Sequence, residues 1–291
     1  MKKNISVTYN GTQATVGKLQ VNRMLPNYYA NTVGPFVFLD YVYPYQQKPE
    51  TPEAPDGKFA HPHRGIATFS YLFSGELEHY DSQGNYGIVS AGGAQWMNAG
   101  NGIIHDEHLS QAFQKNGGVL HSLQFWVNLP AKNKIEAPAY LAVQPQDIPE
   151  IELADGTGKL RVLIGDYEGY SSPVVTFTKQ FIFHIRINPN QTFHFEAESG
   201  LEYAAFIPTT SIQIDGNEYG NSELLVFSEE GTSLDFTNTH NEVVDLILFG
   251  GERYQEPIAA EGPFVMNSRL EVAEAYRDFF SGKYGKIEYT H

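Results

Sequence analysis

The sequence predicts an all-β fold of two antiparallel β-barrels that ends in one helix. Short extended runs separated by turn signals fill the first half of the chain, which is typical of an antiparallel barrel or sandwich. The same rhythm returns after residue 150, and only the C-terminal end carries a helical pattern. A chain of 291 residues can form one large β domain or two, and the repeat favours two, over residues 1–133 and 134–291.

The first extended segments lie in residues 5–24, around the turn Asn10-Gly11. Residues 34–40 read as a buried strand that leads into a long aromatic and proline-rich loop, residues 41–55. The loop directly precedes a histidine pair, so it is either a lid over a site or a plain surface connection.

Residues 61–107 alternate extended runs with turns. The turn signals are Ser74-Gly75, Gly84-Asn85, Gly92-Gly93 and residues 99–102. The alternating apolar side chains of Leu123, Phe125 and Val127 then predict a strand that closes the first barrel. Residues 130–149 are rich in Ala, Pro, Lys and Gln, and we interpret them as the linker.

The second half repeats the strand rhythm and then changes period. Its predicted strands are residues 160–164, 181–187, 192–195, 203–207, 211–214, 224–227 and 243–249. Ser268 and Glu271 form a capping box that starts a helix, and Gly282 ends it. Its apolar stripe predicts that the helix packs on a barrel; the stripe consists of Val272, Ala275, Tyr276, Phe279 and Phe280.

Composition excludes several kinds of protein. Thirty-four acidic against 19 basic residues give a net charge of −15, which disfavours direct binding to nucleic acid or to anionic membranes. The N-terminus has no apolar segment typical of a signal peptide or a membrane span, so we expect a soluble cytoplasmic protein. The absence of cysteine excludes disulfides, thiolate ligands and cysteine nucleophiles, and leaves imidazole and carboxylate as the strong metal ligands.

Two pairs of such ligands enclose the stretch from residue 61 to residue 107. The first pair is His61 and His63, and the second is His105 and Glu107. Each pair is spaced i, i+2, so on a β-strand both side chains point to one face, and Asp106 points away. Two such strands side by side would direct three imidazoles and one carboxylate at one point, which favours a metal site in the mouth of a barrel.

Spacing alone does not single out these pairs. Ten histidines give roughly a third of a His-x-His pair by chance, and a strand histidine is also often a surface or core residue. About one histidine followed at i+2 by a carboxylate is expected, whereas the chain has four. The other three are His79-Asp81, His194-Glu196 and His240-Glu242. The second half has no His-x-His, and we predict that it binds no metal.

The choice between the pairs comes from a resemblance to the pirin family of the cupin superfamily. The matching segments are residues 61–65 (HPHRG), 75–82, 95–107 (QWMNAGNGIIHDE), 123–130 (LQFWVNLP) and 262–267 (GPFVMN). The resemblance implies two cupin barrels, with a metal in the first barrel held by His61, His63, His105 and Glu107. It also implies Fe(II), whereas the ligand types alone accept Mn, Ni, Cu, Co or Zn as well.

The resemblance to pirins implies quercetin 2,3-dioxygenase-like activity, in which a flavonol binds the metal and O2 opens its ring. Glu107 is then the base that takes the hydroxyl proton. The alternatives are a non-catalytic, metal- or redox-dependent regulator that binds a transcription factor or a metabolic enzyme, and a different small-molecule enzyme on the same site.

One position departs from the family. Pirins commonly have Glu-Thr where this chain has Ala67-Thr68. Along an unbroken strand, Ala67 would lie on the same face as His63, four residues earlier. We therefore expect that this chain lacks, at position 67, a carboxylate that would hydrogen-bond to a metal ligand or to a bound water.

Overall fold

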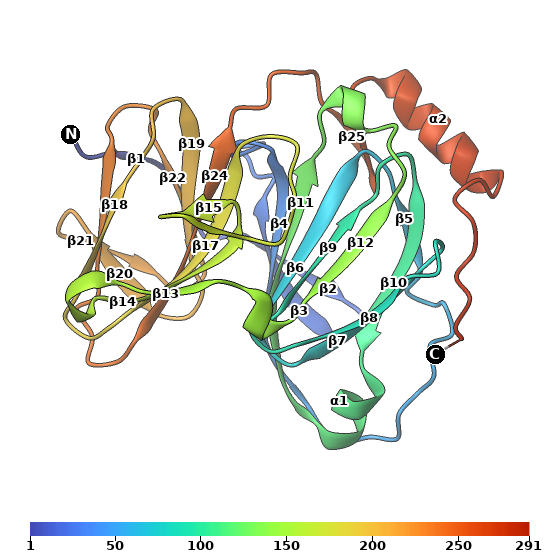
Figure 1. The fold of residues 1–291 in the computed structure, drawn as a ribbon, viewed down its shortest axis with the longest axis horizontal. Helices are drawn as coiled ribbons and strands as arrows, with labels where there is room; N and C mark the ends of the chain where they lie inside the picture. The colour runs from blue at the N-terminus through green and yellow to red at the C-terminus, as the bar shows by residue number, and fades with distance from the viewer. Residues whose placement is uncertain (291) are drawn as a thin grey trace. The chain divides into compact units, whose positions relative to one another are not determined.

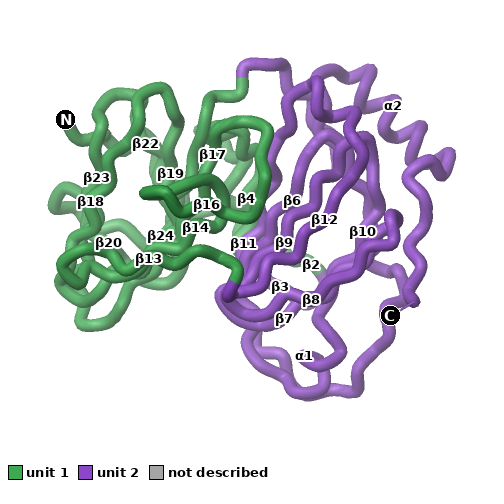
Figure 2. Tube along the Cα trace, viewed as in Figure 1, with its two compact units in different colours: residues 1–16, 21–41, 147–254 green, residues 17–20, 42–146, 255–291 purple. Residues whose placement is uncertain are grey.

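The computed structural model describes residues 1–290, which form two compact units (Figures 1 and 2). Unit 1 comprises residues 1–16, 21–41 and 147–254, and unit 2 comprises residues 17–20, 42–146 and those from 255 onward. Both units consist mainly of antiparallel strands, and the chain ends in the helix α2 (Arg269–Phe280). The predicted all-β class with two barrels and a C-terminal helix is confirmed.

Each compact unit combines residues from both sides of position 133. The first strand β1 (Ile5–Tyr9) pairs with β22 (Glu223–Phe227), which places the N-terminus in the unit that holds the second half of the chain. The strands β3 (Leu19–Leu25) and β4 (Phe36–Gln47) run from one unit into the other. The division at residue 133 stays a prediction from the sequence.

Unit 1 contains two main sheets, of order β1-β22-β19-β24-β17-β14-β13 and β18-β23-β20-β21. Its further strands are β2 (Thr12–Val16), β13 (Glu150–Glu152), β14 (Gly158–Ile164), β15 (Asp166–Tyr167), β16 (Tyr170–Ser171), β17 (Gln180–Ile187), β18 (Thr192–Glu196), β19 (Leu201–Ile207), β20 (Ser211–Ile214), β21 (Asn217–Gly220), β23 (Ser233–Thr237) and β24 (Val244–Glu252), with a short 3-10 turn, η3 (Ala154–Gly156). Apolar side chains from both sheets fill the space between them, including Phe183, Phe195, Tyr203 and Phe236.

Unit 2 also has two sheets, one of order β5-β10-β7-β8 and one that includes the order β12-β9-β6-β11. Its elements are β5 (His61–His63), β6 (Ile66–Ser74), β7 (Glu76–Asp81), β8 (Tyr86–Ser90), β9 (Ala94–Asn98), β10 (Ile103–Leu109), α1 (Gln111–Asn116), β11 (Gly118–Asn128), η1 (Ala131–Asn133), β12 (Ala139–Val143), β25 (Ala259–Glu261) and β26 (Phe264–Met266). A last 3-10 turn, η2 (Pro145–Asp147), leads into unit 1.

The segment that we interpreted as the linker, residues 130–149, contains the strand β12. Its residues pair with β9, Tyr140 opposite Met97, and their exposure alternates. The strand was missed because Ala and Pro flank it, and a five-residue alternation is short against that background.

The helix α2 begins and ends as predicted. The Ser268 side chain accepts a hydrogen bond from the Glu271 backbone, and the Glu271 carboxylate accepts one from the Asn267 backbone. Gly282 has a φ of 79° just past the last turn, a conformation that favours glycine. The helix packs through Ala275 in a cluster with Phe264 and Tyr284.

One member of the predicted apolar stripe does not belong to the core. Phe280 is 78% exposed, because the helix ends there and its last side chain projects beyond the packed surface. Among residues 1–290, no helix combines the length and apolar character needed to cross a membrane.

Candidate metal centre

The two predicted ligand strands lie side by side. The strands β5 and β10 are antiparallel, with His61 directly opposite His105 and His63 opposite Ile103. Cross-strand partners point to the same face of a sheet, so this register directs the imidazoles of His61, His63 and His105 to one place.

The three imidazoles are close enough to hold one ion. Their nearest ligand atoms lie within 4.8 Å of one another, and Nε2 of His61 is 3.0 Å from Nε2 of His105. Nδ1 of His61 donates to the Phe59 carbonyl (2.8 Å) and Nδ1 of His63 to the Pro263 carbonyl (3.1 Å). These bonds leave both Nε2 atoms with a free lone pair, as a metal site requires. The described residues therefore fit a metal ion.

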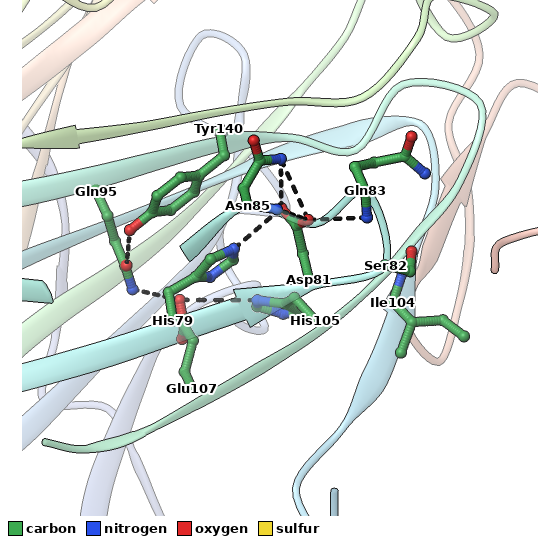
Figure 3. A network of polar contacts seen from close by, with 10 residues as sticks. All are labelled: His79, Asp81, Ser82, Gln83, Asn85, Gln95, Ile104, His105, Glu107 and Tyr140. Atoms are coloured by element: carbon green, nitrogen blue, oxygen red, sulfur yellow. Dashed lines mark hydrogen bonds and ion pairs between the residues drawn. The ribbon is translucent and has the colours of Figure 1, made fainter. Parts of the chain in front are cut away.

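Glu107 is not a member of this group but lies next to one of its histidines, His105 (Figure 3). One carboxylate oxygen is 3.8 Å from Nδ1 of His105, and it also accepts a hydrogen bond from the Gln95 amide at 2.5 Å. The other oxygen accepts a bond from the Gln124 amide at 3.2 Å. Two amides thus hold the carboxylate next to the histidines.

His79 completes a second group of possible ligands with His105 and Glu107. It stands opposite Glu107 across the strands β7 and β10, is fully buried, and stacks on the Tyr140 ring at 3.9 Å. Its Nε2 contacts the Asp81 carboxylate at 3.2 Å (Figure 3). The sequence showed the His79-Asp81 spacing, but three similar pairs hid its significance.

Burial sets the charge of these groups. It lowers the pKa of His63 to about 3, with the neighbouring His61 acting in the same direction. It likewise holds the pKa of His105 well below its usual value. Burial and then the neighbouring Asp106 raise the pKa of Glu107 to about 7, against the lowering effect of its two amide bonds. The imidazoles of His63 and His105 are therefore neutral at physiological pH, as metal binding would require, and Glu107 changes charge in that range.

The neighbouring residue Asp106 points the other way, as predicted. Its carboxylate accepts a hydrogen bond from the hydroxyl of Tyr289 at 2.7 Å. The alternation along β10 therefore separates Asp106 from the histidine face.

The two other histidine–carboxylate pairs of the sequence lie in unit 1. His194 is exposed, and its ring nitrogens contact Asp235 and Glu196. Its strand neighbours Phe193 and Phe195 occupy the interior instead. Nε2 of His240 contacts the Ser211 hydroxyl at 2.9 Å.

The expectation for Ala67 is wrong. The strand is broken after His63, because Gly65 has a φ of 80° and β6 begins only at Ile66 in another sheet. On β6, Thr68 is paired with Trp126, whose ring lies 4.9 Å from that of His63. Ala67 directly precedes Thr68 on the strand and therefore points to the face opposite the one that carries Thr68 and Trp126.

Comparison with known proteins agrees with this architecture. The chain matches the Pirin family over residues 18–127 and the Pirin C-terminal cupin domain over residues 182–285. A Pseudomonas aeruginosa protein named "Putative quercetin 2,3-dioxygenase" is 32% identical over 98% of this chain and 99% of its own. A pirin-like protein of Caulobacter vibrioides is 31% identical over 96% of this chain and 94% of its own.

Solved structures give the same result. The crystal structure of a quercetin 2,3-dioxygenase from Acinetobacter baumannii matches with a TM-score of 0.91 and 30% identity, and covers 99% of this chain and 100% of that one. The two family models match both halves of the chain, and the relative from P. aeruginosa aligns over nearly its whole length. The chain therefore belongs to the pirin family, whose members are built from cupin domains.

Proposed function

We propose that this protein is a metal-dependent dioxygenase that opens the ring of flavonols with O2. In this proposal Fe(II) is the metal, and the ligands are His61, His63, His105 and Glu107. The observation that supports it most is the convergence of three imidazoles beside a carboxylate that two amides hold in place. The names of the relatives from P. aeruginosa and A. baumannii support the choice of substrate.

A bound divalent metal would supply a Lewis acid for the hydroxyl and keto oxygens of a flavonol, and iron would add a redox couple. Mn, Ni, Cu, Co and Zn also accept these ligand types. The protein's own contribution begins with the imidazoles of His61 and His63, which are oriented by the Phe59 and Pro263 carbonyls.

Glu107 is the group that moves the proton. Its pKa of about 7 is close to physiological pH, so the carboxylate can take the hydroxyl proton of the substrate and release it afterwards. Gln95 and Gln124 restrict the carboxylate to one position, which keeps an oxygen within reach of a substrate at the histidines.

The test starts from metal-free protein loaded with Fe(II) without oxygen. Elemental analysis should find one metal per chain. After addition of quercetin and air, the protein should consume quercetin and O2 in equal amounts. Metal-free protein and His105→Ala should consume neither. Loading at one metal per chain without flavonol turnover would refute the catalytic proposal and favour a metal-dependent regulator.

A further inference from the structure

A segment near the C-terminus reaches the histidines. The residues Pro263 to Met266 follow the last strand of unit 1 in the chain but belong to unit 2. The Pro263 carbonyl accepts the hydrogen bond from Nδ1 of His63 at 3.1 Å. A carbonyl can only accept, so this bond keeps the proton on Nδ1 and the lone pair on Nε2.

The backbone next to His63 is bonded to the same segment. The backbone of Val265 donates to the Arg64 carbonyl at 3.2 Å, and Arg64 and Phe264 form a parallel bridge. A Cβ atom at Gly65 would lie 2.1 Å from the Val265 carbonyl oxygen, so only glycine allows this approach.

One buried ammonium group holds the junction together. Lys134 is 2% exposed, and its Nζ donates to the Gly65 carbonyl (2.6 Å), to the Asn128 side chain (2.5 Å) and to the Val265 carbonyl (2.8 Å). Burial lowers the pKa of Lys134 to about 7, and the three acceptors match the three N–H groups of its protonated form. The three acceptors belong to different parts of the chain: Gly65 follows His63 by two positions, Asn128 ends β11, and Val265 lies in the C-terminal segment.

We infer that Lys134 is a positioning residue for the metal centre, because it clamps the segment whose Pro263 carbonyl sets the tautomer and orientation of His63. This inference rests on the metal-binding role proposed above. His61 differs, because its Nδ1 is held by Phe59, only two residues away. A loosened clamp therefore disturbs one of the two histidines of β5 and leaves the other in place.

The test replaces Lys134 with methionine, whose unbranched side chain is one atom shorter and removes all three hydrogen bonds. The matched control is Lys132→Met, because Lys132 lies in the turn η1, which Lys134 follows directly, and is exposed. Titration of metal-free protein with Co(II) should show affinity about 10 to 100-fold lower for Lys134→Met. Its visible absorption band should also change, whereas Lys132→Met should match the parent.

Nitrogen NMR of the metal-free protein measures the tautomer of His63 directly. In the parent, His63 should carry its proton on Nδ1. In Lys134→Met, the His63 signal should shift towards a mixture of tautomers. A parent with the proton on Nε2 would overturn the inference, as would unchanged Co(II) affinity and spectrum in Lys134→Met. If that variant does not fold, Lys134→Gln, with two donors, is measured in its place. A parent that binds no Co(II) would instead refute the proposed metal site.

Discussion

If Glu107 is a metal ligand as proposed, its ionisation should make metal binding depend on pH. A carboxylate must lose its proton to bind a metal, and burial raises the pKa of Glu107 to about 7. With that pKa, about three quarters of the molecules are ionised at pH 7.5 and about 3% at pH 5.5. Apparent metal affinity should therefore fall about 25-fold more between these pH values in the parent protein than in Glu107→Gln.

The assay is a competition titration with a coloured chelator, using Zn(II) so that oxidation does not interfere. Burial lowers the pKa of His63 to about 3, so this imidazole stays neutral over the range. Asp106→Asn should retain the pH dependence but move it to lower pH, because Asp106 raises the pKa of Glu107 although its own side chain points to the other face, towards Tyr289. An equal loss of affinity in the parent and in Glu107→Gln would refute the argument, because Glu107 would then not bind the metal.

Three further predictions follow from the same geometry. Metal-free protein should lose stability as the pH rises from about 4.5 to 7, because the raised pKa of Glu107 favours the protonated form in the fold; Glu107→Gln should lack this component of the thermal unfolding curve. Combining His61→Ala with His105→Ala should abolish metal binding in elemental analysis, and retained metal would locate the site elsewhere. Ala67→Glu should leave Zn(II) affinity unchanged, since residue 67 points away from the histidines; a clear rise would show that it faces them.

Local periodicity was sufficient to predict which side chains share a face on the strands β5 and β10. The i, i+2 spacing predicted that His61 and His63 share a face and that Asp106 opposes Glu107, and β5 and β10 have this arrangement. Such predictions succeed because alternation depends only on neighbouring residues of an extended strand.

The prediction for Ala67 failed where that condition fails. Gly65 has a left-handed conformation, and the chain changes sheet between His63 and Ile66, so the alternation does not continue. A glycine in the sequence permits such a break but does not require it.

The supporting contacts were beyond prediction for a different reason. Pro263 is 200 residues from His63, and Lys134 bonds to residues up to 131 positions away from it. No local pattern reports pairings over these distances. The position of Glu107 against Gln95 and Gln124 likewise depends on how two sheets face each other, which spacing along one strand does not reveal.

The pairing of β1 with β22 determines when this protein can fold during synthesis. The first strand must wait for its partner, because residues 223–227 are synthesised long after residues 5–9. Unit 2 also waits, because it needs the residues after 254. Domains often fold one after another as they emerge, from the N-terminus onward. Here neither unit is complete until residues beyond 250 have been made, so we expect the proposed metal centre to form only after the segment around Pro263 has emerged, and the nascent N-terminal strands to be the stage most exposed to aggregation.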